Sequence, residues 1–231
     1  MIPRVLEPEA MDSPAEAIAY DAMDHAEVNA RFVADFLEVH DLCRGGEVLD
    51  VGTGPARIPI ALCRADPLAR VLGIDLARSM LDLAAQNLVE AGLTDRVRLV
   101  EADAKGVNLP AGSFEAVLSN TIIHHIPDPR LALAELPRLV APGGTLFVRD
   151  LIRPESEAAL AALVTTHAGS EGPAARALFA ESLRAALTIV EVRAIVKEMG
   201  LPAVGVRQTS DRHWTWIWSA LLPLTTVSAR E

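Results

Sequence analysis

Short apolar segments alternate with segments of helical pattern in this chain, and this alternation limits the possible folds most strongly. Strands are predicted at Glu47–Val51, Arg70–Ile74, Val97–Val100, Ala116–Ser119 and Thr145–Arg149. Helices are predicted between them at Pro55–Ala65, Ser79–Glu90 and Leu131–Leu139, with a tight turn at 142–144. Strands that alternate with helices form βαβ units around a parallel sheet. Because the strands lack polar alternation, we expect an α/β fold with helices on both faces of the sheet.

The two ends of the chain extend this pattern. Residues 1–44 are predicted to form an N-terminal helical segment, and residues 155–187 a helical insertion long enough to serve as a lid. The runs Ala203–Thr209 and His213–Ser219 are predicted to form a closing antiparallel hairpin. Without a repeat or a low-complexity linker, residues 1–231 are expected to form a single domain.

Charge and composition exclude several classes of function. The formal net charge is −10, and an acidic chain without a basic stripe repels nucleic acid, so no nucleic-acid partner is expected. Cys43 and Cys63 lack the spacing of metal ligands, and no metal is expected. The longest apolar runs, such as Trp216–Val227, are roughly half the ~20 residues that span a bilayer. Acidic residues stand where a signal peptide would be basic, so the expected location is cytoplasmic, without a membrane partner.

The segment Val48–Ala56 carries the main chemical signal. A strand runs into a turn with Gly52 and Gly54 and then into a helix, which lets backbone approach a nucleotide closely. Asp75 follows Gly54 by 21 residues, the spacing of a carboxylate that binds ribose hydroxyls. Asp50, two residues before the first glycine, would repel a pyrophosphate but attract the sulfonium and ammonium of S-adenosylmethionine. The pattern therefore favours the methyl donor over NAD.

The chain resembles the class I S-adenosylmethionine-dependent methyltransferases. The resemblance is carried by five motifs in the family's order, at Val48–Gly54, Gly73–Leu76, Glu101–Ala104, Phe114–Ile126 and Leu136–Phe147. Ala56 stands where a third glycine is common. The resemblance implies a Rossmann-like seven-stranded mixed sheet of order 3-2-1-4-5-7-6 and the product S-adenosylhomocysteine. It also implies cofactor contacts from Asp50, Gly52, Thr53, Gly54, Asp75, Leu76, Asp103, Ala104, Asn120, Tyr20 and Met23. Tyr20 and Met23 have an equal alternative as parts of a solvated N-terminal helix.

Candidates for catalysis and acceptor binding follow the fourth, fifth and last strands. His124 or His125 is a candidate general base, and the sequence does not choose between them. Asp150, Arg153, Arg212, His213 and Trp214 are candidates for binding the acceptor. Trp214, Trp216 and Trp218 alternate on one strand face, where they form either core packing or an aromatic wall.

The predicted function is methyl transfer from S-adenosylmethionine to a nucleophilic nitrogen, oxygen or sulfur atom of a small molecule. The alternatives are a non-catalytic protein that binds the donor and an NAD-dependent oxidoreductase. Either a monomer or a homodimer is compatible with the sequence. The acceptor, its methylated atom and the use of a base are not determined at this stage.

Overall fold

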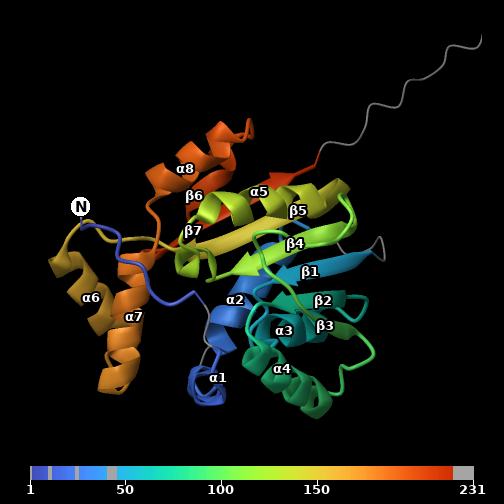
Figure 1. The fold of residues 1–231 in the computed structure, drawn as a ribbon, viewed down its shortest axis with the longest axis horizontal. Helices are drawn as coiled ribbons and strands as arrows, with labels where there is room; N and C mark the ends of the chain where they lie inside the picture. Colours follow the sequence, from blue (N-terminus) through green and yellow to red (C-terminus); the bar gives the residue numbers. More distant parts are fainter. Residues whose placement is uncertain (1, 10–11, 24–25, 41–45, 221–231) are drawn as a thin grey trace, which may run out of the picture.

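The computed structural model describes residues 2–9, 12–23, 26–40 and 46–220. Its seven-stranded sheet has the order β3-β2-β1-β4-β5-β7-β6, which confirms the order implied by the resemblance (Figure 1). The strands are β1 (Glu47–Val51), β2 (Arg70–Asp75), β3 (Val97–Glu101), β4 (Phe114–Asn120), β5 (Val140–Leu151), β6 (Val206–Gln208) and β7 (His213–Ser219).

Strand direction determines where polar side chains gather. Strands β1 to β5 pair in parallel, while β7 pairs antiparallel with both β5 and β6. The carboxyl ends of the five parallel strands therefore share one edge of the sheet. Residues that follow these strands in sequence, such as Gly52, Leu76 and Thr121, are brought together there although they are far apart in the chain.

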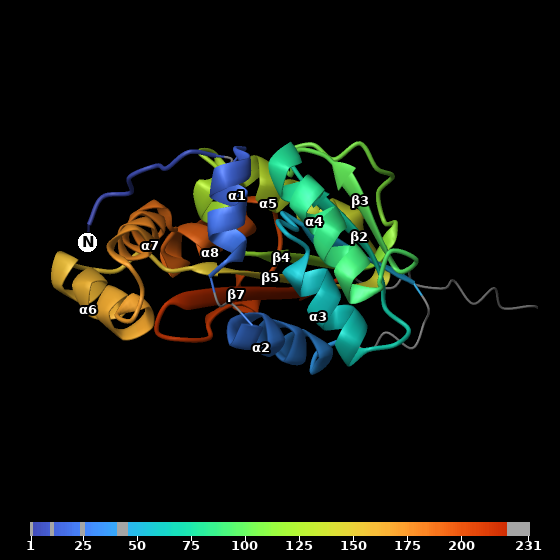
Figure 2. The same cartoon turned by 90° about the horizontal axis from the view of Figure 1, so that it is seen from below.

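Helices cover both faces of the sheet (Figure 2). One face packs against α2 (Ala26–Leu37), α3 (Arg57–Ala65) and α4 (Arg78–Ala91). The other face packs against α5 (Pro129–Leu139) and α8 (Ile189–Glu198). Neighbouring strand residues belong to different cores: Val48 packs with α2 and α3, whereas Leu49 packs with α5 and α8. This alternation explains why the strand sequences are apolar on both faces.

The carboxyl edge of the sheet is covered by further segments. These are α1 (Pro14–Asp21), the 3₁₀ helix η2 (Ile123–His125), α6 (Glu157–Ala168) and α7 (Pro173–Ala185). Residues 2–9 run along α7, where Val5 N donates to Arg184 O at 3.2 Å and Ile2 packs against Leu160 and Leu183 (Figure 1). Helices α6 and α7 occupy the interval of the predicted insertion, and movement of that insertion as a lid stays a prediction.

Three local expectations differ from the structure. Residues 142–144 belong to β5 instead of a tight turn, because an irregularity in the β4–β5 register lets the strand continue through both glycines. Helix α3 begins at Arg57, not at Pro55, so Pro59 lies in the first turn and needs no distortion of the helix. In the final hairpin, residues 203–205 form the 3₁₀ helix η3 (Ala203–Gly205), and the strand begins at Val206.

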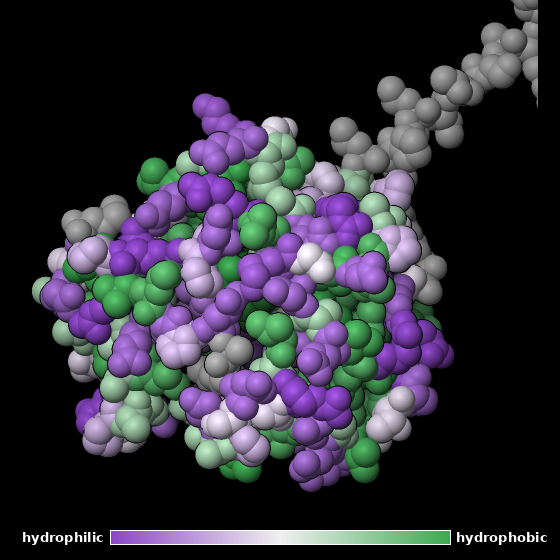
Figure 3. All heavy atoms as spheres, viewed as in Figure 1, coloured by the Kyte–Doolittle hydropathy of each residue, from purple (hydrophilic) through white to green (hydrophobic). Residues whose placement is uncertain are grey.

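The surface and the apolar segments agree with the composition. On the face drawn in Figure 3, hydrophobic residues form small groups among hydrophilic ones. Within the described ranges, no helix has both the length and the apolar character needed to cross a bilayer. Cys63 is a free cysteine that is buried like a small hydrophobic residue. Cys43 lies outside the described residues.

Candidate functional site

The turn after β1 has the backbone geometry of a nucleotide-binding turn. Gly52 and Gly54 adopt φ values of 74° and 51°, which favour glycine. A Cβ on Gly52 would come within 2.3 Å of the Ile122 side chain, whereas a Cβ on Gly54 would meet nothing within 4 Å. Gly52 is therefore required by close packing, and Gly54 leaves open space beside the backbone of the turn. Ala56 also has a positive φ of 62°, at the position of the missing third glycine.

Asp75 is fixed against this turn at the end of β2. Its Oδ2 accepts from Gly54 N at 2.8 Å, and its Oδ1 accepts from Ala77 N at 2.9 Å. Each oxygen keeps a lone pair for a further donor. Burial raises the pKa of Asp75, although both backbone hydrogen bonds oppose this rise. Beyond the end of β3, Lys105 N donates to Asp103 Oδ1 at 2.8 Å. Burial alone would raise the pKa of Asp103, but this hydrogen bond and the Lys105 ammonium together lower it.

Asp50 lies beneath the glycine turn instead of on the pocket surface. Its side chain is buried, and Oδ2 has no hydrogen-bond partner among the described residues. Burial raises the pKa of Asp50 to about 7; the nearby Thr53 side chain opposes this rise, and the Asp75 carboxylate adds to it. A buried carboxylate with an unsatisfied oxygen is costly alone and is stabilised by a nearby cation.

A pocket opens over this edge of the sheet. Predicted residues that line it are Gly52, Gly54, Asp75, Leu76, Asp103, Ala104, Asn120, Tyr20, Met23, His124, His125, Arg212 and His213. Helices α6 and α7 and the connection between them add residues that the sequence did not single out, namely His167, Ala168, Glu171, Ala175, Leu178, Phe179 and Ser182. The pocket therefore has a polar side at the strand ends and a more apolar side at α7.

Two histidines on η2 lie between these sides, and carboxylates hold them in place. His124 Nδ1 is 2.6 Å from Asp150 Oδ1, while Asp150 Oδ2 accepts from Ile123 N and His124 N at 2.5 and 3.2 Å. Glu7 Oε1 is 3.3 Å from His124 Nε2 and 2.9 Å from His125 Nδ1. The two imidazole rings are 4.2 Å apart between centroids.

Protonation of His124 follows from this arrangement. Burial alone would lower the pKa of His124, but Asp150 and Glu7 outweigh it and raise the pKa to about 9. Burial likewise opposes the effect of the histidines on Glu7, whose pKa is nevertheless lowered to about 2. At neutral pH the cluster therefore contains an imidazolium between two carboxylates.

The same cluster bears on the prediction that no metal is bound. Within the described ranges, one atom each from Glu7, His124 and His125 lies within 4.8 Å of the others, which would suit a metal ion. A metal ligand must, however, offer an unprotonated imidazole nitrogen. With a carboxylate beside each of its ring nitrogens, His124 is better explained as a protonated group, and the absence of a metal stays a prediction.

Comparisons with known proteins agree with this geometry. Residues 49–148 match the family model described as a methyltransferase domain. A ubiquinone biosynthesis O-methyltransferase of Methylococcus capsulatus is 36% identical over 118 residues, which cover 51% of this chain and 48% of that protein. A demethylmenaquinone methyltransferase of Thermus thermophilus is 37% identical over 107 residues, which cover 46% of this chain and 48% of that protein. The chain thus spans about half the length of the curated relatives it matches.

Solved structures extend the likeness to the whole fold. A S-adenosylmethionine-dependent methyltransferase from Aquifex aeolicus superposes with a TM-score of 0.66 at 19% identity, covering 90% of this chain and 99% of that one. A putative S-adenosylmethionine-dependent methyltransferase from Methanococcus maripaludis superposes with a TM-score of 0.68 at 15% identity. The match covers 96% of this chain and 100% of that one. Residues 49–148 therefore match a methyltransferase-domain model, and the fold around them is that of solved S-adenosylmethionine-dependent methyltransferase structures.

The residues of the matched segment fit S-adenosylmethionine as a cofactor. Asp75 offers two oxygens with free lone pairs where ribose hydroxyls would donate. Gly54 leaves open space beside them, and the unsatisfied Asp50 oxygen provides negative charge beneath the turn. A cationic ligand without phosphate suits this combination.

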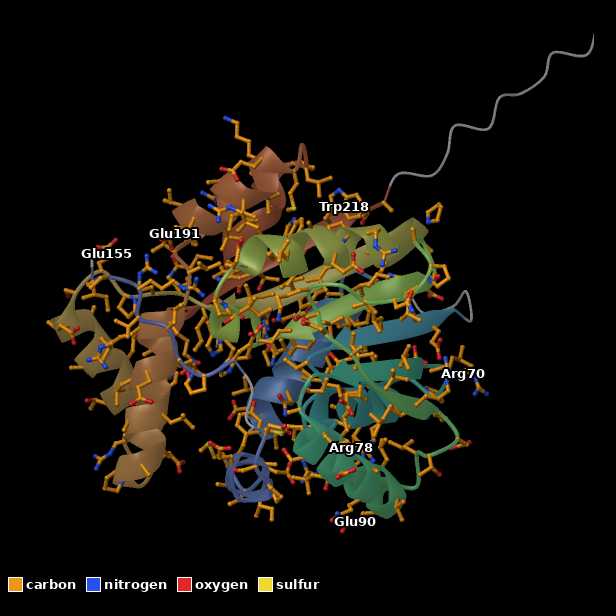
Figure 4. The ribbon with its side chains drawn as sticks, in the orientation of Figure 1. Arg70, Arg78, Glu90, Glu155, Glu191 and Trp218 are labelled. Carbon is orange, nitrogen blue, oxygen red and sulfur yellow. The ribbon has the colours of Figure 1, made fainter. Side chains whose placement is uncertain are left out.

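Several predicted residues lie near the methyltransferase pocket without lining it. Asp50 is buried beneath the turn, Thr53 lines a neighbouring pocket beside α2 and α3, and Asp150 contacts His124. Arg153 is buried, where it donates to Ala186 O at 2.9 Å and to Glu191 on α8 at 2.7 Å; Figure 4 labels Glu191. The expectation that Arg153 contacts the acceptor therefore requires correction, because its guanidinium is already paired with the Glu191 carboxylate of α8.

The three tryptophans form core packing and not an aromatic wall of the pocket. Trp214 and Trp216 are fully buried in the core with α8, and Trp218 packs at its border (Figure 4). Trp214 does not line the pocket, so its assignment to acceptor binding is also corrected. The reason is strand geometry: the face that carries the three indoles is the face that α8 covers.

Proposed function

We propose that this protein transfers a methyl group from S-adenosylmethionine to a nucleophilic oxygen, nitrogen or sulfur atom of a small molecule. The observation that carries the proposal is one pocket in which Gly54 and Asp75 face the apolar residues of α7 across the two histidines of η2. Relatives named ubiquinone biosynthesis O-methyltransferases support a small acceptor, and they favour oxygen among the three atoms. Asn120, Tyr20 and Met23 line the same pocket and are proposed to contact the donor.

S-adenosylmethionine supplies an electrophilic methyl group on a good leaving group. The protein therefore contributes mainly by orienting the two reactants in a pocket that excludes water, an effect of several kcal/mol. Residues 2–9 and α7 cover the edge of the sheet, and both segments contact the η2 region. Helix α7 therefore forms one wall of the pocket beside the glycine turn.

A hydroxyl acceptor must lose a proton, and His125 is the better candidate for removing it. His124 keeps its own proton at neutral pH, because its pKa is raised to about 9 by Asp150 and Glu7 despite its burial. His125 lines the pocket with 18% of its side chain exposed, and Glu7 lies beside only its Nδ1. We assign the base role to Nε2 of His125, and a positioning role to His124.

The first experiment is calorimetric titration with S-adenosylhomocysteine, with NADH as the control. Binding of the former alone, followed by transfer of labelled methyl groups to small molecules of a cell extract, is the expected result. Donor binding without transfer to any acceptor would favour the non-catalytic alternative. Binding of NADH instead would refute the proposal and favour an oxidoreductase.

A further inference from the structure

One guanidinium on the apolar side of the pocket has no partner. Arg212 lies half-buried in the loop between β6 and β7, and its side chain makes no hydrogen bond or ion pair with any described residue. The other arginines that are buried or half-buried all have partners: Arg4, Arg96, Arg149, Arg153 and Arg184. The adjacent Asp211 is 2.6 Å from His167 Nε2. Burial lowers the pKa of Arg212.

A second donor stands beside Arg212. Ser210 Oγ accepts from the backbone N–H groups of Arg212 and His213, at 3.2 and 3.0 Å. Both lone pairs of the hydroxyl are then used, so its proton is donated to His213 Nδ1 at 2.9 Å. Burial, together with Arg212 and Arg149, lowers the pKa of His213 to about 4. His213 is therefore neutral, and its Nε2 carries a hydrogen.

Apolar side chains line the pocket near these two donors. Leu151 pairs with His213 across β5 and β7 and lines the same pocket. Phe179 of α7 packs against the small core that contains Leu151, and Leu178 lines the pocket next to it. A ligand that reaches Arg212 is therefore in contact with apolar side chains along its body.

We propose that the methyl acceptor is a small carboxylic acid with an apolar body, and that Arg212 and His213 bind its carboxylate. This inference rests on the proposed function. A planar guanidinium matches a carboxylate in geometry, and burial strengthens the pairing. Glu9 and Glu171 also line the pocket and the chain is acidic overall, which disfavours a doubly charged phosphate.

The test measures binding of three aromatic acids, namely benzoate, 4-hydroxybenzoate and 4-hydroxycinnamate, in the presence of S-adenosylhomocysteine. Their neutral amides and phenyl phosphate serve as comparisons. At least one acid is expected to bind about tenfold or more tightly than its amide and than phenyl phosphate. Arg212→Met is expected to abolish the preference for the acid. The matched control is Arg176→Met, because Arg176 is exposed on α7 and, among the described residues, unpaired; it should keep the preference.

Each other outcome counts against the inference. The inference is overturned if acid and amide bind equally, if no acid binds, or if Arg212→Met keeps the preference for the acid. Tighter binding of phenyl phosphate would also overturn it and would indicate a phosphate group in place of the carboxylate. An unchanged affinity of each variant for S-adenosylhomocysteine shows that the pocket is folded. If the unmodified protein does not bind S-adenosylhomocysteine, the proposed function fails instead.

Discussion

Glu7→Gln removes the carboxylate that lies between the two histidines while keeping the shape of the side chain. Glu7 is only 7% exposed, and its pKa falls from 4.5 to about 2 because the effect of His124 and His125 exceeds that of burial. A pKa lowered this far corresponds to about 3 kcal/mol. We expect the substitution to lower the free energy of unfolding by about 2–3 kcal/mol at pH 5.5.

The loss should depend on pH in a direction set by both partners. The lowered pKa of Glu7 contributes stability above pH 4.5, which is lost as the pH falls through about 2. The pKa of His124, which Asp150 and Glu7 raise to about 9 against burial, contributes stability below pH 6.5, which is lost as the pH rises through about 9. Both groups are charged in the folded protein between these limits, so the effect of Glu7→Gln is largest near pH 5.5 and smaller at pH 10.

Urea denaturation at pH 5.5 and pH 10 measures this difference directly. The control is Glu38→Gln, which changes an exposed carboxylate after α2 and should alter the free energy of unfolding by less than about 0.5 kcal/mol at either pH. If Glu7→Gln lowers the free energy of unfolding equally at both pH values, the side chain of Glu7 contributes through its packing and not through its charge. A loss under about 1 kcal/mol at pH 5.5 would refute the imidazolium cluster.

Four further predictions concern the site. Asp75→Asn should weaken binding of S-adenosylhomocysteine about tenfold or more, measured by calorimetry, because charged acceptors of ribose hydroxyls are lost. His125→Gln should lower turnover about a hundredfold while leaving that affinity unchanged; an unchanged rate would remove His125 as the base. Since burial raises the pKa of Asp50 to about 7, binding of S-adenosylmethionine should strengthen as the pH rises through 7, and a flat profile is expected for Asp50→Asn. EDTA should leave activity unchanged, whereas restoration of an inhibited enzyme by a divalent metal would assign Glu7, His124 and His125 to a metal site.

The strand ends were predictable because their signals are local. The glycines at 52 and 54 and the acidic residues that end strands are read from a few neighbouring residues, and the parallel sheet then brings them together. The same local reading failed at 142–144, since a register irregularity between two strands decides whether glycines end or continue β5. It also failed for Arg153, because the partner on α8 follows 38 residues later.

The contribution of Glu7 could not be found in this way. In the sequence, Glu7 is one of several acidic residues near the N-terminus, with no motif around it. Its position beside the histidines depends on Arg4, which donates to the carbonyls of His124, Ile126 and Ala185. Contacts across more than a hundred residues leave no periodic pattern in the chain.

The span of the methyltransferase match divides the residues that line the pocket into two groups. Gly54, Asp75 and Asp103 lie within residues 49–148, whereas Tyr20, Met23, the α7 residues and Arg212 lie outside. Most of the proposed donor contacts are therefore in the matched segment, and the proposed acceptor side is in the flanking segments. For engineering, exchanging α6, α7 and residues 210–213 between relatives should transfer acceptor preference without rebuilding the donor site. For interpreting other genomes, a match to residues 49–148 alone carries information on the methyl donor and little on what is methylated.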